Sequence, residues 1–140
     1  MSQEPIQSVT PDEANRMLPL VGAIVKDLSE LSLRVSERRQ RISQIAPGRE
    51  NESDLYSEEV SAIVKELERD VRELERYESE LEQLGVTCKD QVEGIVTFPS
   101  ELDGRRICLS WKHGESEVMY WHEMGEGFDD RQPLPAYADS

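Results

Sequence analysis

Residues 10–45 decide the fold, and they read TPDEANRMLPLVGAIVKDLSELSLRVSERRQRISQI. The first four residues carry a complete helix start. Thr10 can accept a hydrogen bond from the amide of Glu13, and Glu13 can reach back to the amide of Thr10. Pro11 occupies the first helical position, where the missing N–H costs nothing. The stretch therefore predicts a helix that begins with a capping box.

Apolar residues then recur at every third or fourth position, which is the spacing of one helix face. They are Val21, Ile24, Leu28, Leu31, Val35, Ile42 and Ile45. The resulting seam extends over about four heptads, with Arg38 in its one interrupted position. Pro19 removes a helical hydrogen bond, so we expect a kink near Pro19 or a short separate first helix. The first helix is predicted over residues 10–46.

A second helix is predicted over residues 54–84, after a polar connector. The pair Pro47–Gly48 ends the first helix, and Ser53 and Asp54 can cap the second. Gly85 supplies the left-handed residue that ends it. Its apolar stripe consists of Leu55, Val60, Ile63, Val64, Leu67, Val71, Leu74, Tyr77, Leu81 and Leu84. Two helices of about 30 residues joined by a short loop form an antiparallel hairpin.

The charges agree with this antiparallel arrangement. It places the basic end of the first helix, from Arg34 to Arg41, beside the acidic beginning of the second. The acidic residues there are Glu58, Glu59, Glu66 and Glu68. Surface ion pairs contribute little energy, so we expect these charges chiefly to select the orientation of the helices.

Beyond the second helix the periodicity changes to the alternation that is typical of strands. Three strands are predicted, at Gly94–Phe98, Arg106–Trp111 and Glu117–His122. Pro99 is expected to close the first strand, and turns are expected over 102–104 and 112–115. A sheet this small needs a cover. We expect that cover to come from Met17, Leu18, Leu20, Leu84 and Val86.

The predicted fold class is therefore α+β. A long antiparallel, coiled-coil-like helical hairpin is followed by a small three-stranded antiparallel β-meander over residues 94–123. Residues 124–140 are expected to be irregular. A chain of 140 residues suits a single domain over residues 1–140.

The composition bounds the class of function. There are 30 acidic residues against 16 basic ones, which gives a formal net charge of −14. This charge repels nucleic-acid phosphates and anionic lipid, so nucleic acid is an unfavoured partner, although the arginines between Arg34 and Arg41 keep RNA open as a third possibility. The sequence has no apolar run long enough to span a membrane and no secretory signal. We expect a soluble, cytoplasmic protein without membrane association.

The two cysteines, Cys88 and Cys108, are interpreted as reduced, half-buried structural residues. A disulfide is the weaker alternative. A metal site with His113 and His122 is another, but zinc sites usually contain closely spaced cysteine pairs, and Cys88 stands alone. We expect no metal and no cofactor.

Distinctive short motifs lie in the C-terminal half of the chain. They are WKHGE at 111–115, YWHE at 120–123 and GFDDRQPL at 127–134. With Phe98–Pro99 and Thr10–Ala14, they make nearly the whole chain resemble the bacterial domain-of-unknown-function family 2203. The resemblance implies a capped first helix, a long helical pair and an uncharacterised cytoplasmic protein. It implies no activity, substrate or cofactor.

The densest set of reactive side chains gives a candidate functional surface of Trp111, Glu115, Trp121, His122, Phe128 and Arg131. His122 with Glu115 or Glu123 could act as a general base or hold a metal, which gives the alternative function of a small metal-binding protein or hydrolase. No nucleophile motif accompanies His122, and the H-E pair lacks the second histidine of a zinc protease. We favour a structural interpretation with no catalytic residue. In it Glu115 fixes a turn and Arg131 ties down the C-terminal loop.

Strand alternation places Trp121 and His122 on opposite faces of one strand. Both can be buried only if both faces of the sheet are covered. We therefore expect one of the two to lie near a surface or an interface.

The hairpin has more apolar surface than two helices can bury between them, and such surface favours a partner. The candidate interface consists of Val60, Ile63, Val64, Leu67, Val71, Leu74 and Tyr77. The commonest solution is a homodimer in which two hairpins form a four-helix bundle. A different protein supplying the other helices is the alternative. The sequence thus favours a non-enzymatic interaction or scaffold protein.

Overall fold

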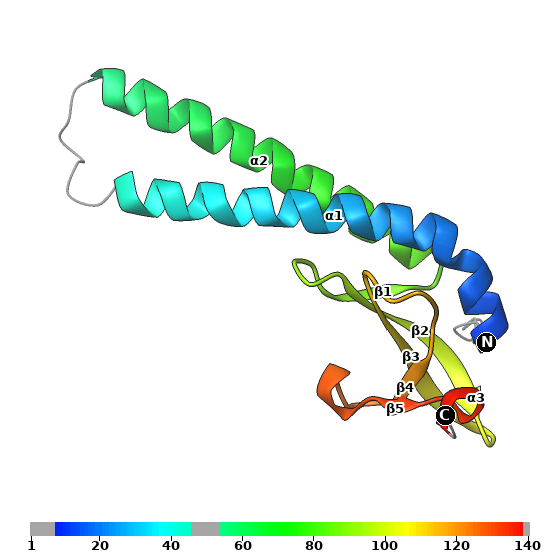
Figure 1. The fold of residues 1–140 in the computed structure, drawn as a ribbon. Helices are drawn as coiled ribbons and strands as arrows, with labels where there is room; N and C mark the ends of the chain where they lie inside the picture. The colour runs from blue at the N-terminus through cyan, green and yellow to red at the C-terminus, as the bar shows by residue number, and fades with distance from the viewer. Residues whose placement is uncertain (1–7, 46–53, 139–140) are drawn as a thin grey trace, which may run out of the picture.

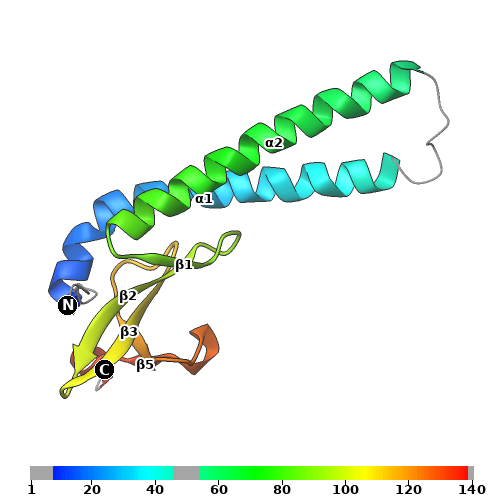
Figure 2. The ribbon, with the colours of Figure 1, turned by 180° about the vertical axis from the view of Figure 1, so that it is seen from behind.

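The computed structural model of the protein describes residues 8–45 and 54–138. Two long helices, α1 (Pro11–Ile45) and α2 (Asp54–Gln83), lie over one end of an antiparallel sheet and project well beyond it (Figures 1 and 2). The predicted combination of a helical hairpin with an antiparallel sheet is therefore confirmed. Across the described ranges, no helix has the length and apolar character needed to cross a membrane.

The start of α1 is the predicted capping box. The amide of Thr10 donates to Glu13 Oε1 at 2.9 Å, and the amide of Glu13 donates to Thr10 Oγ1 at 3.1 Å. Pro19 lies inside α1, which continues through it as one helix. The N-terminal turns of α1 bend away from the axis of the remainder (Figures 1 and 2), as expected when a proline interrupts helical hydrogen bonding.

The end of α2 is fixed by Gly85, which adopts the left-handed conformation with φ of 82°. The amide of Val86 donates to the carbonyl of Leu81 at 2.9 Å, and the amide of Gly85 donates to the carbonyl of Glu82 at 2.9 Å. This pair of bonds is a Schellman motif. Val86 and Leu81 are both buried, so the motif also anchors the end of α2 in the core.

Arg38, in the interrupted position of the α1 seam, binds across to α2. Its guanidinium pairs with Asp70, and its Nη2 lies 3.7 Å from Glu66 Oε1. The Arg38 and Asp70 side chains are only 29% and 22% exposed. A half-buried ion pair between the helices helps to fix their register.

The sheet has five strands rather than the predicted three. In sequence order they are β1 (Thr87–Asp90), β2 (Ile95–Leu102), β3 (Arg105–Lys112), β4 (Tyr120–Glu123) and β5 (Gln132–Pro133), and each pairs antiparallel with the next. The two edge strands, β1 and β5, were not predicted from the sequence. They contain four and two residues, which is too short for alternation to be recognisable.

The prediction that Pro99 closes the first strand is wrong, because β2 continues through it. The Pro99 carbonyl accepts a hydrogen bond from the amide of Val9 at 2.8 Å. In a strand, the nitrogen and oxygen of one residue point to the same side, so Pro99 turns its missing donor toward the segment at Val9. On that side β1 pairs only with residues 95–97 of β2. Pro99 therefore removes no bond from the ladder.

The turn between β2 and β3 confirms the prediction at 102–104. Asp103 and Gly104 both have positive φ, 54° and 81°, as a type I′ hairpin requires. Leu102 pairs with Arg105 across this turn. The two-residue loop fixes the β2–β3 register, and with it the side chains that share each face of the sheet.

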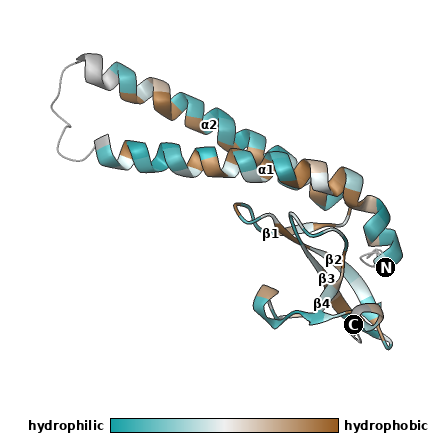
Figure 3. Ribbon diagram, viewed as in Figure 1, coloured by the Kyte–Doolittle hydropathy of each residue, from teal (hydrophilic) through white to brown (hydrophobic). Residues whose placement is uncertain are grey.

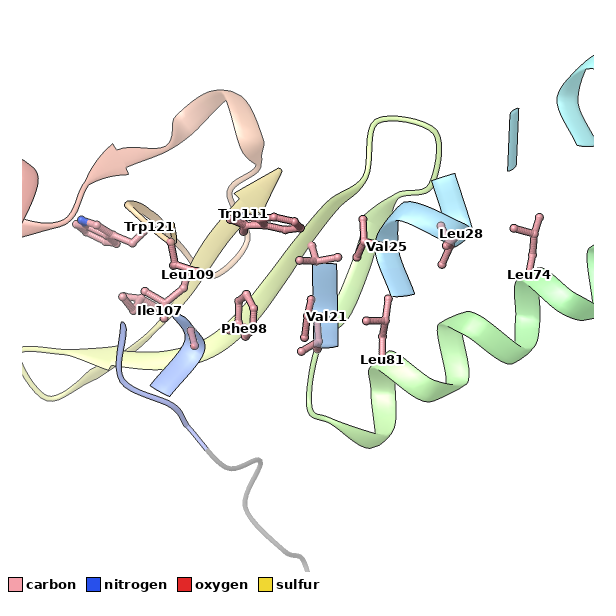
Figure 4. Close-up of a cluster of buried hydrophobic side chains, with 14 of the residues drawn as sticks. Val21, Val25, Leu28, Leu74, Leu81, Phe98, Ile107, Leu109, Trp111 and Trp121 are labelled. Atoms are coloured by element: carbon pink, nitrogen blue, oxygen red, sulfur yellow. The ribbon is translucent and has the colours of Figure 1, made fainter. Parts of the chain in front are cut away.

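The core lies between α1, the end of α2 and one face of the sheet, which we call the inner face. Figure 4 shows the α1 side chains meeting the sheet side chains there. Its buried members include Val21, Val25, Leu28, Leu81, Val96, Phe98, Ile107, Leu109, Trp111 and Trp121. Met17, Leu18 and Leu84 pack partly buried against this core, and Val86 is buried within it. The expectation for Leu20 is wrong, since it is 54% exposed.

Candidate functional site

The functional side chains are divided between the two faces of the sheet. Strand pairing places Thr97 opposite Ser110, Ser110 opposite Tyr120, and Cys108 opposite His122. These residues line the face away from the helices, which we call the outer face. Trp111 and Trp121 point to the inner face and are 4% and 8% exposed.

His122 is also buried, at 3% exposure, because the segment around Phe128 covers part of the outer face. Both faces of β4 are therefore covered. We expected Trp121 or His122 to lie near a surface; both side chains are buried, and His122 reaches the surface at the hollow described below.

Arg131 forms a clamp with Glu115 on the outer side of the molecule. Its Nη1 lies 3.1 Å from Glu115 Oε1 and its Nη2 lies 2.9 Å from Oε2, which is bidentate pairing. The guanidinium carbon is 3.9 Å from the ring centroid of Phe128 and 4.2 Å from that of Tyr120. The two side chains of the pair are 13% and 20% exposed. Two aromatic rings and one carboxylate therefore hold Arg131 in place.

Glu115 also fixes the turn that follows β3. Its Oε1 accepts from the amide of Lys112 at 3.0 Å, and its carbonyl accepts from Trp111 Nε1 at 3.0 Å. This confirms the interpretation in which Glu115 holds a turn and Arg131 ties down the C-terminal segment. Both carboxylate oxygens of Glu115 are engaged, and neither is hydrogen-bonded to His122.

Glu123 is engaged elsewhere too. Its Oε1 and Oε2 lie 3.2 Å and 2.5 Å from the Nε and Nη2 of Arg105. Since Glu123 follows His122 in the strand, the two side chains point to opposite faces. The structure thus assembles neither carboxylate–histidine pair, and no finding favours the metal-binding or hydrolase alternative. In the part of the chain that the structure describes, no three histidine, cysteine or acidic residues form a group able to hold a metal ion.

The tautomer of the neutral His122 ring follows from the hydrogen bond that its Nδ1 makes. Nδ1 lies 2.9 Å from the carbonyl oxygen of Glu123. A carbonyl can only accept, so Nδ1 carries the hydrogen. In the neutral ring, Nε2 then holds the lone pair and is a hydrogen-bond acceptor.

A hollow of about 270 Å³ opens on the outer face above His122. Its floor contains Thr97 and His122, and its apolar walls are Ile95 and Phe128. Its remaining lining consists of Lys89, Asp90, Glu126 and Gly127. Ser110 lies next to Thr97 on the same face, and its hydroxyl is fully buried without a hydrogen-bond partner in the described part of the chain.

The cysteines have the character of structural thiols. Both are free and half-buried. Burial, with a smaller contribution from the charge of Glu78, raises the pKa of Cys88 to about 11. Burial also raises the pKa of Cys108. Neither thiol is activated as a nucleophile, because activation requires a lowered pKa.

Three members of the outer face were not predicted from the sequence, namely Thr97, Ser110 and Tyr120. Each is a polar or amphipathic residue between apolar neighbours in a strand, which is a detectable signal. Their proximity, however, depends on strand register, which the sequence left open. The hollow also needs Lys89 from β1, a strand that was not predicted.

The candidate interface residues on α2 fall into two groups. Leu74 is buried at 6%, and Leu67, Val71 and Tyr77 pack partly buried against the core. The remaining three, Val60, Ile63 and Val64, are half-buried and do not belong to the core or its margin. We call these three residues the distal seam.

Comparison with known proteins yields one match. A family model described as "Uncharacterized conserved protein (DUF2203)" matches residues 8–134. No curated protein and no solved structure matches the chain.

Proposed function

Because the chain belongs to the uncharacterised conserved family DUF2203, whose description assigns no activity, we propose a function from geometry alone. The protein is a non-enzymatic cytoplasmic interaction protein. It forms a homodimer through the distal half of its helical hairpin, and the two hairpins make a four-helix bundle. The observation that carries this proposal is the incomplete burial of the distal seam.

The distal seam continues an apolar stripe beyond the region that the chain can cover. Among the described side chains of α2, only Leu74 and Leu81 are buried, at 6% and 0% exposure. Figure 3 shows hydrophobic residues recurring along α2 into its N-terminal half, where the sheet no longer lies beside the helices. Half-buried valine and isoleucine side chains favour further burial, at about 25 cal/mol for each Å² removed from water.

The charges of the distal hairpin favour a second copy as the partner. Residues 34–45 of α1 contain four arginines and one glutamate, whereas residues 58–70 of α2 contain five acidic and two basic residues. Arg38 pairs with Asp70 of α2, and Arg34, Arg39 and Arg41 are exposed.

One surface that carries both signs of charge is self-complementary about a twofold axis. In such a dimer, the basic α1 of each copy lies beside the acidic α2 of the other. These pairs select the homotypic partner and its orientation, while the apolar seam supplies the energy.

Light scattering after size-exclusion chromatography tests the proposal. The wild-type protein is expected to elute at twice the chain mass of 16.0 kDa at micromolar concentration. Ile63→Glu places a charge in the distal seam and is expected to give a single-chain mass. Ala62→Glu adds the same charge at the neighbouring, exposed position and is expected to leave the dimer intact.

Circular dichroism of both variants separates loss of association from loss of folding. A wild-type protein that elutes at the mass of one chain would overturn the proposal. So would a dimer that Ile63→Glu, correctly folded, leaves unchanged. In the first case a different protein becomes the remaining candidate partner of the seam.

A further inference from the structure

We propose that the hollow on the outer face binds a small organic amine, whose N–H groups donate to His122 Nε2 and to the carboxylates at the rim. The site lies on the side of the sheet away from the helices. It is therefore independent of the dimer proposed above.

The polar floor of the hollow is the first argument. Thr97 and His122 are 5% and 3% exposed, and Thr97 stands in its strand between the apolar residues Val96 and Phe98. The hydroxyl of Ser110, beside Thr97, has no partner within the described residues. Buried polar groups are normally hydrogen-bonded, and an unsatisfied one costs about 1–3 kcal/mol. Ser110 does not itself line the hollow, but Thr97 and His122 do, and their polar atoms can bond to a ligand that enters it.

The tautomer of His122 determines what the ligand must supply. Since Nδ1 already donates to the Glu123 carbonyl, Nε2 needs a donor. The Thr97 hydroxyl can both donate and accept. The floor therefore recognises a ligand that carries at least one N–H or O–H group.

The rim selects a positively charged donor. Asp90 and Glu126 line the hollow with one cationic residue, Lys89. Each carboxylate is oriented by a backbone amide: Asp90 Oδ1 accepts from Glu93 at 2.9 Å, and Glu126 Oε1 accepts from Glu123 at 3.0 Å. One oxygen of each carboxylate remains for a ligand. The net charge of −14 adds a long-range attraction for cations.

The walls and volume of the hollow indicate the polarity and size of the ligand that fits it. Ile95 is 8% exposed and Phe128 is half-buried, so the hollow combines apolar sides with a polar floor. Arg131 stacks on Phe128 and holds the ring in place. A volume of about 270 Å³ accommodates one small ring with a short side chain. The combined features describe a compact apolar body that bears an ammonium group.

Three probes that share a phenyl ring but differ in charge test whether the hollow prefers a cation. The full chain, labelled with ¹⁵N at histidine, is titrated with benzylamine, benzyl alcohol and benzoate while the imidazole resonances are followed by NMR. Benzylamine is expected to move the Nε2 resonance of His122 saturably, and to bind about tenfold tighter than benzyl alcohol. Benzoate is expected to give no saturable shift, because it brings a negative charge and no donor.

Two variants test the assigned contacts. Thr97→Val removes a hydroxyl at nearly constant volume and is expected to weaken benzylamine binding about tenfold. Thr87→Val makes the same change on β1, at an exposed residue outside the lining of the hollow, and is expected to leave binding unchanged. Glu126→Gln removes a rim charge outside the core. It is expected to weaken the binding of benzylamine and to leave the binding of benzyl alcohol unchanged.

Failure to shift His122 with benzylamine at millimolar concentration would overturn the inference. Tighter binding of benzoate than of benzylamine would overturn the charge assignment. Equal losses of affinity for benzylamine and for benzyl alcohol in Glu126→Gln would also overturn the charge assignment. If Thr97→Val does not fold, the Glu126→Gln result decides alone, because Glu126 is exposed.

Discussion

The two halves of the helical hairpin differ in how their apolar faces are covered. Over the sheet, the α1 residues Val21, Val25 and Leu28 are at most 1% exposed. In the distal half, Ile63 and Val64 have the same chemical character but are only half-buried. The difference arises because the sheet reaches only one end of the hairpin (Figure 1).

This contrast shows that contacts within the chain bury one half of its hairpin more completely than the other. We propose that association of two copies covers the less buried half. The half-buried pair of Arg38 with Asp70 lies near the boundary between the two halves. Equivalent substitutions in the two halves should therefore differ in their effect on stability.

The largest effect is expected in the core over the sheet. Leu28→Ala removes a fully buried side chain and should lower the free energy of unfolding by about 2–5 kcal/mol. Leu33→Ala, at a position on the same helix that is 50% exposed, should change it by no more than about 0.5 kcal/mol. Urea denaturation measures both. Similar losses in the two variants would contradict the assignment of the core.

The next effect concerns the clamp on the outer face. Arg131→Ala breaks a mostly buried bidentate pair and should cost about 2–3 kcal/mol in the same assay. Arg131→Lys should restore only part of the loss, because lysine cannot pair with both oxygens in one plane. Arg105→Ala removes a similar arginine–glutamate pair at 52% exposure and should cost less than about 1 kcal/mol. Equal costs for Arg131→Ala and Arg105→Ala would mean that burial does not distinguish these pairs.

A smaller effect is expected at the start of α1. Thr10→Ala removes the side-chain bond to the amide of Glu13 and should cost about 1 kcal/mol. Thr10→Ser keeps the hydroxyl and should be nearly neutral. Thermal unfolding, monitored by circular dichroism, ranks the stability of the two variants. A serine variant as unstable as the alanine variant would show that the cap does not account for the loss.

The smallest effect in dilute solution is expected in the distal seam. Val64→Ala should cost less than about 1 kcal/mol when the protein is monomeric, since the side chain is only half-buried. The cost should increase with protein concentration, because association adds stability by mass action. A cost that is constant across concentrations would show that Val64 makes no contact between copies.

The helices were predictable because their signals are local and repeated. The capping box at Thr10 needs four consecutive residues, and the seams of α1 and α2 repeat over many turns. Gly85 was predictable for the same reason, since a left-handed residue at the end of an apolar stripe leaves few alternatives. The type I′ turn at Asp103 and Gly104 is likewise encoded in adjacent residues.

The sheet edges and the outer face could not be predicted in the same way. Strands β1 and β5 are too short for alternation, and β5 is defined by its pairing with β4. The hollow requires Thr97, His122 and Phe128 to meet, which depends on two strand registers and on the path of the C-terminal segment. His122 and Phe128 were recognisable from the sequence as candidate residues, but the pairing of Glu115 and Glu123 with arginines depends on the folded chain.

Amide hydrogen exchange at several protein concentrations tests whether a second copy covers the distal half, because it reports on both halves of the hairpin in one sample. If a second copy completes the distal half, protection of the amides in residues 58–67 should increase from micromolar to millimolar concentration. Protection in residues 21–28 should remain constant over the same range, and Ile63→Glu should abolish the concentration dependence in residues 58–67. Protection in residues 58–67 that is already high at the lowest concentration and does not change would contradict the account.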